Sequence, residues 1–177
     1  MLNVGFIGAG RVSTVHAIEY LQSKDARIAA IADLDRDLGL ERARAWGVPE
    51  DRVVTDYKDL LGMGDIDAVE VLLPHHLHHP IALEAFAAGK HVFVEKPMTG
   101  TIQQADEMIA AAKAAGKMLR IHEQLIFHEP VVRVKQMTDA GEIGDLISIR
   151  HKTFIGRSDK AWVVPMSSRQ WRMEPEK

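Results

Sequence analysis

A glycine-rich turn near the N-terminus holds the first residues whose types and spacing suggest chemistry. Gly8 and Gly10 lie between an apolar run over residues 2–7 and a segment with apolar residues at helical spacing. Glycine at position 8 permits a tight turn, and glycine at position 10 lets the backbone come close to a pyrophosphate. The N–H groups that open the next helix, where Arg11 and Val12 stand, would stabilise the phosphate charge. The turn therefore predicts dinucleotide binding, and an ordinary glycine turn is the alternative.

An acidic residue follows at the distance that such a turn requires. Asp33 ends the second apolar run, 23 residues after Gly10, where a carboxylate can accept hydrogen bonds from the adenosine ribose hydroxyls. A negative charge there repels a 2′-phosphate, and Leu34 rather than an arginine comes next, so NAD is predicted over NADP. Asp33 could instead cap the helix that begins near Asp35, although Asp35 could supply that cap itself.

A histidine cluster stands between Pro74 and Pro80. Its four histidines occupy positions 75, 76, 78 and 79, and imidazoles three or four residues apart on a helix could share a metal ion. The two prolines constrain the segment, however, and no acidic residue or cysteine accompanies it. A strand-end loop whose histidines cap a helix or face a ligand is therefore favoured, and no metal site is predicted. Ligands of open α/β sheets bind beyond such strand ends.

A lysine stands at another predicted strand end. Glu95, Lys96 and Pro97 close the apolar run over 91–95. The Lys96 ammonium group could hold a substrate hydroxyl, stabilise a developing alkoxide or act as a general acid. A solvated Glu–Lys pair at a turn is an equal alternative, and a cis bond before Pro97 is left open.

The composition fits a globular chain of one domain and part of a second. Of 177 residues, 46% are hydrophobic and 27% are charged, and the net charge is −3. This balance gives no basic surface for nucleic acid, and no apolar run is long enough for a membrane span. The lack of cysteine excludes disulfides, thiolate catalysis and Cys-ligated zinc. The N-terminus does not resemble a secretion signal, so the cytoplasm is the expected compartment.

Elements of strand and helix character alternate along most of the chain. Strands are predicted over 2–7, 28–32, 52–55, 68–73, 91–95 and 118–122, and helices over 11–21, 35–46, 57–61, 80–88 and 102–115. This alternation with short connections predicts an α/β fold, a doubly wound parallel sheet covered by helices on both faces. Such a sheet would bring the glycine turn, Asp33 and Lys96 to the same edge.

The pattern changes after residue 123. A helix is predicted over 130–140 and one long strand over 146–155, followed by irregular residues. A lone strand cannot bury its apolar face, and its unpaired edge invites a partner strand. We therefore expect 1–123 to form a nucleotide-binding domain, 124–177 to form the incomplete beginning of a second domain, and the chain to form a homo-oligomer.

These motifs together resemble the glucose-fructose oxidoreductase, inositol 2-dehydrogenase and MocA family, called Gfo/Idh/MocA. The strongest similarity covers 73–98, where the family has a strand, Pro, Asn, two residues and His, then Ala-Gly-Lys-His-Val and Glu-Lys-Pro. This chain has the same order, with His75 in the Asn position and His78 in the His position. Residues 122–130 resemble the segment that crosses into the family's second domain, and 141–144 resemble the turn before its first long strand.

The resemblance implies a Rossmann domain followed by an α+β open-sheet domain for substrate binding and oligomerisation. It implies NAD(P)-dependent hydride transfer between nicotinamide and a hydroxyl or carbonyl of a sugar or polyol-like substrate. It makes Lys96 the catalytic residue that binds and polarises the reacting oxygen, and it places His75 and His78 beside the nicotinamide. The other cofactor contacts that it implies come from Leu73, Pro74, Glu95, Lys96 and Glu123.

Three departures from the family pattern matter. Ser13 replaces the usual glycine or alanine in the turn, and His75 replaces asparagine. The family's Gly-Gly, Asp and His motif, whose histidine transfers the proton, has no counterpart before Lys177. We therefore expect a truncated enzyme that lacks the catalytic histidine and binds NAD with little or no turnover. A non-catalytic dinucleotide-binding module and a metal-binding protein that uses the four histidines are the alternatives.

Overall fold

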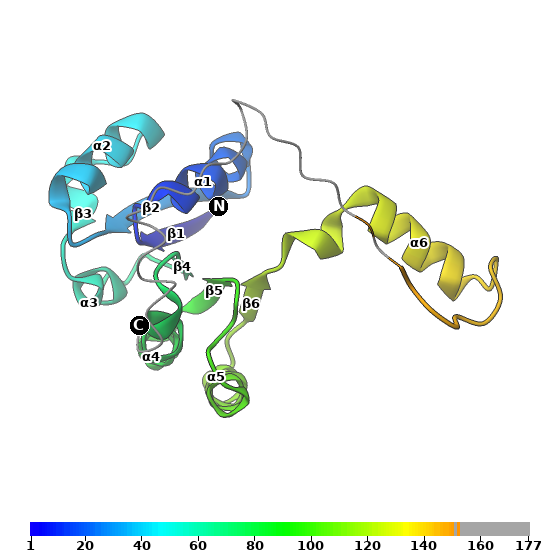
Figure 1. The fold of residues 1–177 in the computed structure, drawn as a ribbon. Helices are drawn as coiled ribbons and strands as arrows, with labels where there is room; N and C mark the ends of the chain where they lie inside the picture. Colours follow the sequence, from blue (N-terminus) through cyan, green and yellow to red (C-terminus); the bar gives the residue numbers. More distant parts are fainter. Residues whose placement is uncertain (151, 153–177) are drawn as a thin grey trace. The chain divides into compact units, whose positions relative to one another are not determined.

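The computed structural model describes residues 1–150 and residue 152. The chain divides into two units, the first running from Met1 to His122 and the second starting at Glu123. The first unit is a sheet with helices on both faces (Figure 1). Within the described residues, no helix has the length and apolar character needed to cross a membrane.

Six strands of the first unit form one parallel sheet in the order β3-β2-β1-β4-β5-β6. The strand order reverses between β1 and β4, because the chain builds the sheet outward from its centre in both directions. This topology confirms the predicted α/β fold with a doubly wound sheet. The strands are β1 Leu2–Ile7, β2 Ala26–Ala32, β3 Val53–Val54, β4 Ala68–Val71, β5 His91–Glu95 and β6 Leu119–His122.

Helices pack on both faces of this sheet (Figure 1). Two of them, α1 and α2, cover one face, while α3, α4 and α5 cover the other. The α-helices of this unit are α1 Arg11–Gln22, α2 Arg36–Trp46, α3 Tyr57–Leu61, α4 His75–Ala87 and α5 Ile102–Ala115. A 3₁₀ helix over Glu50–Arg52 connects α2 to β3.

Short sequence signals set the ends of two of these helices. The side chains of Asp35 and Thr101 accept hydrogen bonds from backbone N–H groups three residues further on, at 3.0 and 3.2 Å. These caps open α2 and α5 by satisfying N–H groups that have no partner within the helix. Gly47 and Gly116 stand where the same helices end, as glycine commonly does.

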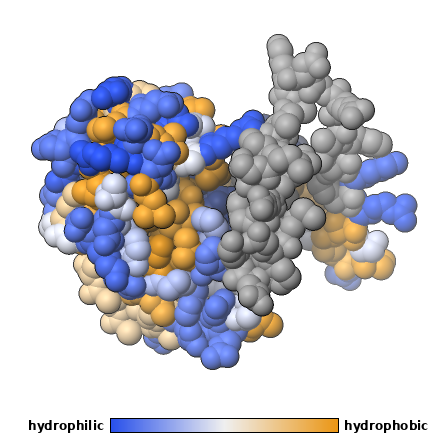
Figure 2. All heavy atoms as spheres, turned by 60° about the vertical axis from the view of Figure 1, so that its left-hand side comes forward, coloured by the Kyte–Doolittle hydropathy of each residue, from blue (hydrophilic) through white to orange (hydrophobic). Residues whose placement is uncertain are grey.

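Each face of the sheet has its own apolar core. On the α1 side, the buried ring of Phe6 contacts Tyr20 and Trp46 edge-on, with ring centroids 5.4 and 5.6 Å apart. On the opposite side, Leu60 and Met108 are fully buried. Figure 2 shows hydrophobic and hydrophilic residues interspersed over the outside of the molecule on the face in view. Burial on both faces explains why the central strands have continuous apolar sequences.

Helix α4 begins earlier than predicted. The prediction starts this helix at Pro80, whereas the structure starts it at His75, with Pro74 as the residue before its first turn. The N–H of Leu77 donates to the carbonyl of Pro74 at 2.9 Å, so a helical turn forms before Pro80 is reached. Proline inside a helix removes one backbone hydrogen bond and crowds the carbonyl four residues earlier, yet α4 continues through Pro80. The four histidines therefore lie on the helix and not in the predicted loop.

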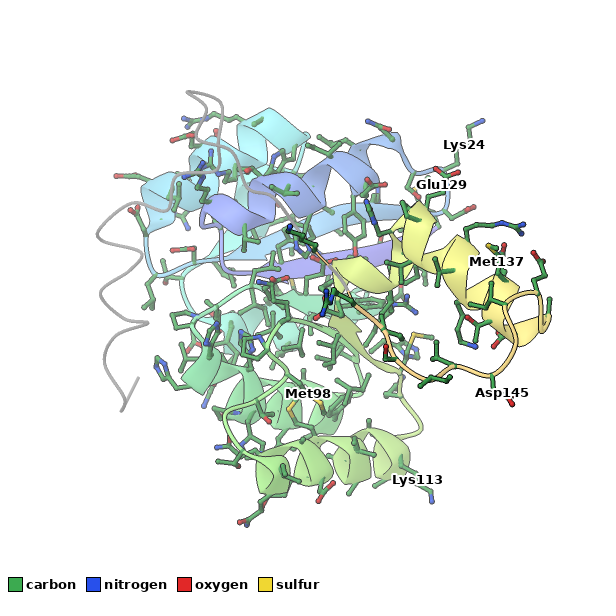
Figure 3. The ribbon with its side chains drawn as sticks, turned by 45° about the vertical axis from the view of Figure 1, so that its right-hand side comes forward. Lys24, Met98, Lys113, Glu129, Met137 and Asp145 are labelled. Atoms are coloured by element: carbon green, nitrogen blue, oxygen red, sulfur yellow. The ribbon has the colours of Figure 1, made fainter. Side chains whose placement is uncertain are left out.

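The second unit contains a 3₁₀ helix, Gln124–Phe127, and helix α6, Glu129–Asp139. Figure 3 labels Glu129 and Met137 on α6 and Asp145 in the segment that follows. The helix predicted over 130–140 is thus confirmed, and it begins and ends one residue earlier than predicted.

The long strand predicted over 146–155 is not formed in its described part. Residues 146–150 have no regular secondary structure, and Ile147 is 96% exposed. A strand needs a hydrogen-bonded neighbour, and within residues 1–150 the strands that pair are all in the first unit. The remainder of this prediction, and the irregular segment over 156–177, lie outside the described residues.

Candidate functional site

The glycine turn lies where the strand order reverses. Gly8 follows β1 with a φ angle of 103°, which L-residues with a side chain rarely adopt. A Cβ at this position would come within 2.5 Å of the carbonyl oxygen of Leu72, just beyond β4. The Leu72 N–H in turn donates to the carbonyl of Ile7 at 2.9 Å. Both the backbone angle and the space therefore require glycine at position 8.

Gly10 is placed differently, because a Cβ at this position would meet nothing within 4 Å. Gly10 precedes α1 and has no side chain to cap it, and no acidic residue lies in the first turn of α1. Ser13 is fully buried and its Oγ donates to the Gly10 carbonyl at 2.5 Å, so the small residue needed at this position is present. The backbone beside the first-turn N–H groups of α1 is therefore unobstructed at Gly10, as the predicted pyrophosphate contact requires.

Asp33 lies beside this turn, half-buried after β2. Its Oδ2 accepts a hydrogen bond from the N–H of Ala9 at 2.6 Å, and its Oδ1 accepts one from the N–H of Asp35 at 2.9 Å. The cap of α2 comes from Asp35, whose own carboxylate accepts from the N–H of Leu38. Asp33 is therefore held at the glycine turn and not used as a helix cap.

His78 joins the ends of β4 and β5. Its fully buried ring lies between two backbone carbonyls, with Nδ1 2.8 Å from the oxygen of Pro97 and Nε2 2.8 Å from the oxygen of Leu73. Carbonyl oxygens only accept hydrogen bonds, so a ring with one proton donates to one of them and a ring with two protons to both. The ring therefore holds the segment after Lys96 against the segment before α4.

The other histidines of α4 do not converge on a common point. The ring of His75 lies beside that of His78, with centroids 5.6 Å apart. His76 is exposed, and the Nε2 of His79 lies 2.7 Å from a carboxylate oxygen of Glu107 on α5. The four histidine rings therefore point in different directions around α4, and they do not surround the shared ion that their spacing had suggested.

Glu95 and Lys96 end β5 at the same edge of the sheet. The peptide bond between Lys96 and Pro97 is cis, and the Lys96 side chain is exposed. The carboxylate of Glu95 faces His16 of α1, with 3.4 Å between Oε2 and Nε2. Met98, which follows Pro97, packs against the core on the α4 side (Figure 3).

A buried polar cluster lies beneath α1, and the sequence prediction missed it. Glu70 on β4 is only 1% exposed. The hydroxyl of Tyr20 donates to its Oε1 at 2.5 Å, and Nδ1 of His16 lies 2.9 Å from its Oε2. His122, at the end of β6, places Nε2 3.4 Å from Oε1 of Glu70. A glutamate inside an otherwise apolar buried strand is the signal in the sequence that could have revealed this cluster.

The cluster favours the charged forms of His16 and Glu70. Burial lowers the pKa of His16, but hydrogen bonding and attraction from Glu70 and Glu95 outweigh it and raise this pKa to about 9. Burial raises the pKa of Glu70, but the nearby imidazoles of His122 and His16 outweigh burial and lower this pKa to about 2. Burial and the nearby Glu70 carboxylate raise the pKa of Tyr20 above its ordinary value.

The remaining predicted site residues occupy varied positions. Arg11 is exposed on the first turn of α1, and Val12 is half-buried against the core. Leu73 and Pro74 are half-buried between β4 and α4. Glu123 is the first residue of the second unit.

Known proteins resemble this chain over most of its length. The 1-carboxy-3-chloro-3,4-dihydroxycyclohexa-1,5-diene dehydrogenase of Comamonas testosteroni is 31% identical over 163 residues, which cover 90% of this chain and 41% of that protein. The crystal structure of the WlbA dehydrogenase from Bordetella pertussis, in complex with NADH and UDP-GlcNAcA, is 28% identical with a TM-score of 0.74. The match covers 81% of this chain and 43% of the WlbA chain.

A second similar structure is that of KijD10, a 3-ketoreductase from Actinomadura kijaniata, in complex with TDP-benzene and NADP. This structure is 31% identical to the chain, with a TM-score of 0.74. The match covers 81% of this chain and 45% of the KijD10 chain. The chain spans between 34% and 41% of the length of the curated relatives that it matches.

A family model described as an oxidoreductase family with an NAD-binding Rossmann fold matches residues 2–123. This range contains the whole parallel sheet, the glycine turn at its centre, Asp33 beside that turn and Lys96 at the end of β5. The chain therefore belongs to the Gfo/Idh/MocA family of oxidoreductases.

Proposed function

We propose that the first unit binds a nicotinamide dinucleotide at the C-terminal edge of its sheet. We propose further that the whole protein transfers hydride between the nicotinamide and a hydroxyl or carbonyl group of a small substrate. One observation carries this proposal: the turn at Gly8 and Gly10 packs against the end of β4 and is held by Asp33. This is the place where the strand order reverses, and ligands of open α/β sheets bind there.

NAD is the cofactor that Asp33 favours. Its carboxylate would accept hydrogen bonds from the ribose hydroxyls, and its negative charge would repel the 2′-phosphate of NADP. The two backbone hydrogen bonds to Asp33 support this role, because they hold the carboxylate beside the turn. The similar structures include one with NADH and one with NADP, so the choice rests on this chain's own carboxylate.

A bound nicotinamide supplies the hydride donor or acceptor, and the protein supplies position and charge. The exposed ammonium of Lys96 would bind the reacting oxygen and stabilise negative charge that develops on it. His78 fixes the backbone on both sides of this site, at Leu73 and Pro97. We place His75, Pro74 and Glu95 around the nicotinamide, with Glu123 as a further cofactor contact.

A sugar or polyol-like compound is the proposed substrate. The WlbA structure holds UDP-GlcNAcA, which is a nucleotide sugar, and this supports the substrate class. We propose that 124–177 begin a substrate-binding and oligomerisation domain.

Fluorescence titration with NADH tests the binding step. We expect a saturable signal from the 177-residue chain and its loss in Gly10→Val, whose side chain would fill the open space before α1. Absence of a saturable signal, or a Gly10→Val variant that binds like the parent, would overturn the proposal.

An assay of substrate-dependent NADH formation then separates an enzyme from a non-catalytic binding module. If the parent chain forms NADH slowly from sugars or polyols and Lys96→Met abolishes this activity, catalysis takes place at the proposed site. NADH binding with no NADH formation from any of these substrates favours the binding module.

A further inference from the structure

We propose that His16, Glu70 and His122 bind one divalent transition-metal ion of the zinc class on the α1 side of the sheet. Three elements supply these residues: α1, β4 and the end of β6. One possible ligand atom from each lies within 4.8 Å of the others. Imidazole and carboxylate groups are the ligands that zinc takes when cysteine is not used.

The register of the sheet brings the three residues to one face. Glu70 pairs with Phe93 in the ladder between β4 and β5, and Glu95 pairs with His122 in the ladder between β5 and β6. Residues two apart in a strand point the same way, so Phe93 and Glu95 share a face and bring Glu70 and His122 onto it. His16 reaches this face from α1, its ring edge-on to that of His122 with centroids 4.4 Å apart.

The distances between the ligand atoms suit a small ion. Glu70 presents one carboxylate oxygen to each imidazole, with 2.9 Å from Oε2 to Nδ1 of His16 and 3.4 Å from Oε1 to Nε2 of His122. A tetrahedral zinc ion with bonds of about 2.0–2.2 Å holds adjacent ligand atoms about 3.3–3.6 Å apart. Small side-chain movements would therefore place three ligands around one ion and leave a fourth position for water.

His122 points a buried nitrogen into this cluster. Its Nε2 is shielded from solvent and, among the described residues, has no hydrogen-bond partner. A buried ring nitrogen without a partner costs free energy, and coordination of a cation would remove that cost. The same nitrogen faces Oε1 of Glu70, so in the tautomer that leaves Nε2 unprotonated its lone pair points at the proposed ion position.

Two neighbouring groups would orient the ligands. Nδ1 of His16 faces Glu70 while its Nε2 faces a carboxylate oxygen of Glu95 at 3.4 Å. Metal-binding histidines usually direct their second ring nitrogen to a carboxylate in this way. The Tyr20 hydroxyl donates to Oε1 of Glu70 and would help to orient that ligand. An ion with two positive charges would also balance the two carboxylates of the cluster.

Zinc titration of the chelator-treated 177-residue chain tests this site. We expect one saturable equivalent by calorimetry, and a visible absorption band when Co²⁺ replaces Zn²⁺. His122→Gln removes a ligand and should weaken zinc binding by at least about 100-fold. Tyr20→Phe removes only a hydroxyl beside a ligand and should weaken it by about 10- to 100-fold.

His76→Gln is the matched control, because His76 is exposed on α4 and belongs to the histidine-rich segment. It should leave the zinc affinity unchanged. NADH titration and circular dichroism show whether each variant is folded, and Tyr20→Phe decides the question if His122→Gln does not fold. A folded parent without saturable zinc binding would overturn the proposal. So would binding that His76→Gln abolishes, or binding that both cluster variants keep.

Discussion

The carboxylate of Asp33 accepts a hydrogen bond of 2.6 Å from the backbone N–H of Ala9, so an acidic residue after β2 holds the middle of the glycine turn. Its second oxygen accepts from the N–H of Asp35 at 2.9 Å. A carboxylate has about four acceptor positions, and those left over can receive ribose hydroxyls. Asp33 thus has both a structural and a proposed ligand-binding task.

Asp33→Asn should weaken NADH binding and reduce the preference for NADH over NADPH. The amide keeps one oxygen to accept a backbone hydrogen bond but removes the charge that attracts donors and repels a 2′-phosphate. Hydrogen bonds to charged groups contribute about 1.5–3 kcal/mol, so we expect a loss of about 10- to 100-fold in NADH affinity. Parallel fluorescence titrations with the two nucleotides measure this.

Asp37→Asn is the control for that experiment. Asp37 is exposed in the first turn of α2, so its substitution changes the net charge by the same amount. We expect it to leave the ratio of the two nucleotide affinities unchanged. Equal shifts in the two variants would show that the preference comes from overall charge and not from Asp33.

Gly8→Ala should lower the stability of the first unit, whereas Gly10→Ala should lower its NADH affinity. At Gly8 a Cβ would clash with the Leu72 carbonyl and the φ angle of 103° is unsuited to alanine, so we expect a loss of at least about 2 kcal/mol in the free energy of unfolding. At Gly10 the Cβ meets open space, so the unfolding free energy should hold while NADH affinity falls. Urea unfolding and NADH titration of both variants separate the two roles.

His78→Leu should destabilise the first unit by about 2–5 kcal/mol, because it removes the buried ring that lies between the carbonyls of Leu73 and Pro97 and donates to at least one of them. His76→Leu, on the exposed side of the same helix, should change the unfolding free energy by no more than about 0.5 kcal/mol. Thermal unfolding monitored by circular dichroism gives both values. Similar stabilities for the two variants would show that the His78 ring does not join the two strand ends.

Lys90→Met should destabilise the opposite edge of the sheet without affecting cofactor binding. The buried ammonium of Lys90 donates to the carbonyls of Met63 and Ile66 at 2.7 and 2.9 Å. Leaving both acceptors unsatisfied costs about 2–4 kcal/mol. Because Lys90 precedes β5, it lies at the N-terminal edge, away from the glycine turn. Lys113→Met on the exposed surface of α5 (Figure 3) is the control.

The pH dependence of Lys90 follows from its burial, which lowers its pKa below the ordinary 10.5. The unfolded chain therefore binds this proton more tightly than the folded one. The contribution of Lys90 to stability should rise as pH passes from the lowered value toward 10.5. Urea unfolding of the parent and of Lys90→Met across this range should show a difference that grows with pH, and a constant difference would contradict it.

The elements with clear local signals could be predicted from the sequence. The bounds of β1, β5 and α5 agree with the prediction, because Gly8 and Pro97 limit the two strands and Thr101 and Gly116 limit the helix. The start of α4 could not be placed in this way, since Pro74 and Pro80 are both compatible with a helix start. The structure starts α4 at His75, and His78 then lies between the carbonyls of Leu73 and Pro97, the second of which follows another strand.

The polar cluster was beyond the reach of sequence spacing. His16 and Glu70 are separated by 54 positions, and only the strand order of the sheet places them together. The glycine turn and Asp33 were found because their mutual distance along the chain is fixed by one strand–helix–strand unit. No such local constraint relates β4 to β6.

Helix α1 reaches both of the proposed binding sites. Its first turn borders the open space beside Gly10, and its next turns direct His16 and Tyr20 onto Glu70. An ion that fixed α1 against β4 would therefore change the affinity for the dinucleotide. Because linked binding equilibria are reciprocal, the dinucleotide would change the affinity for the ion by the same factor. The two equilibria would be linked through a single helix of 12 residues.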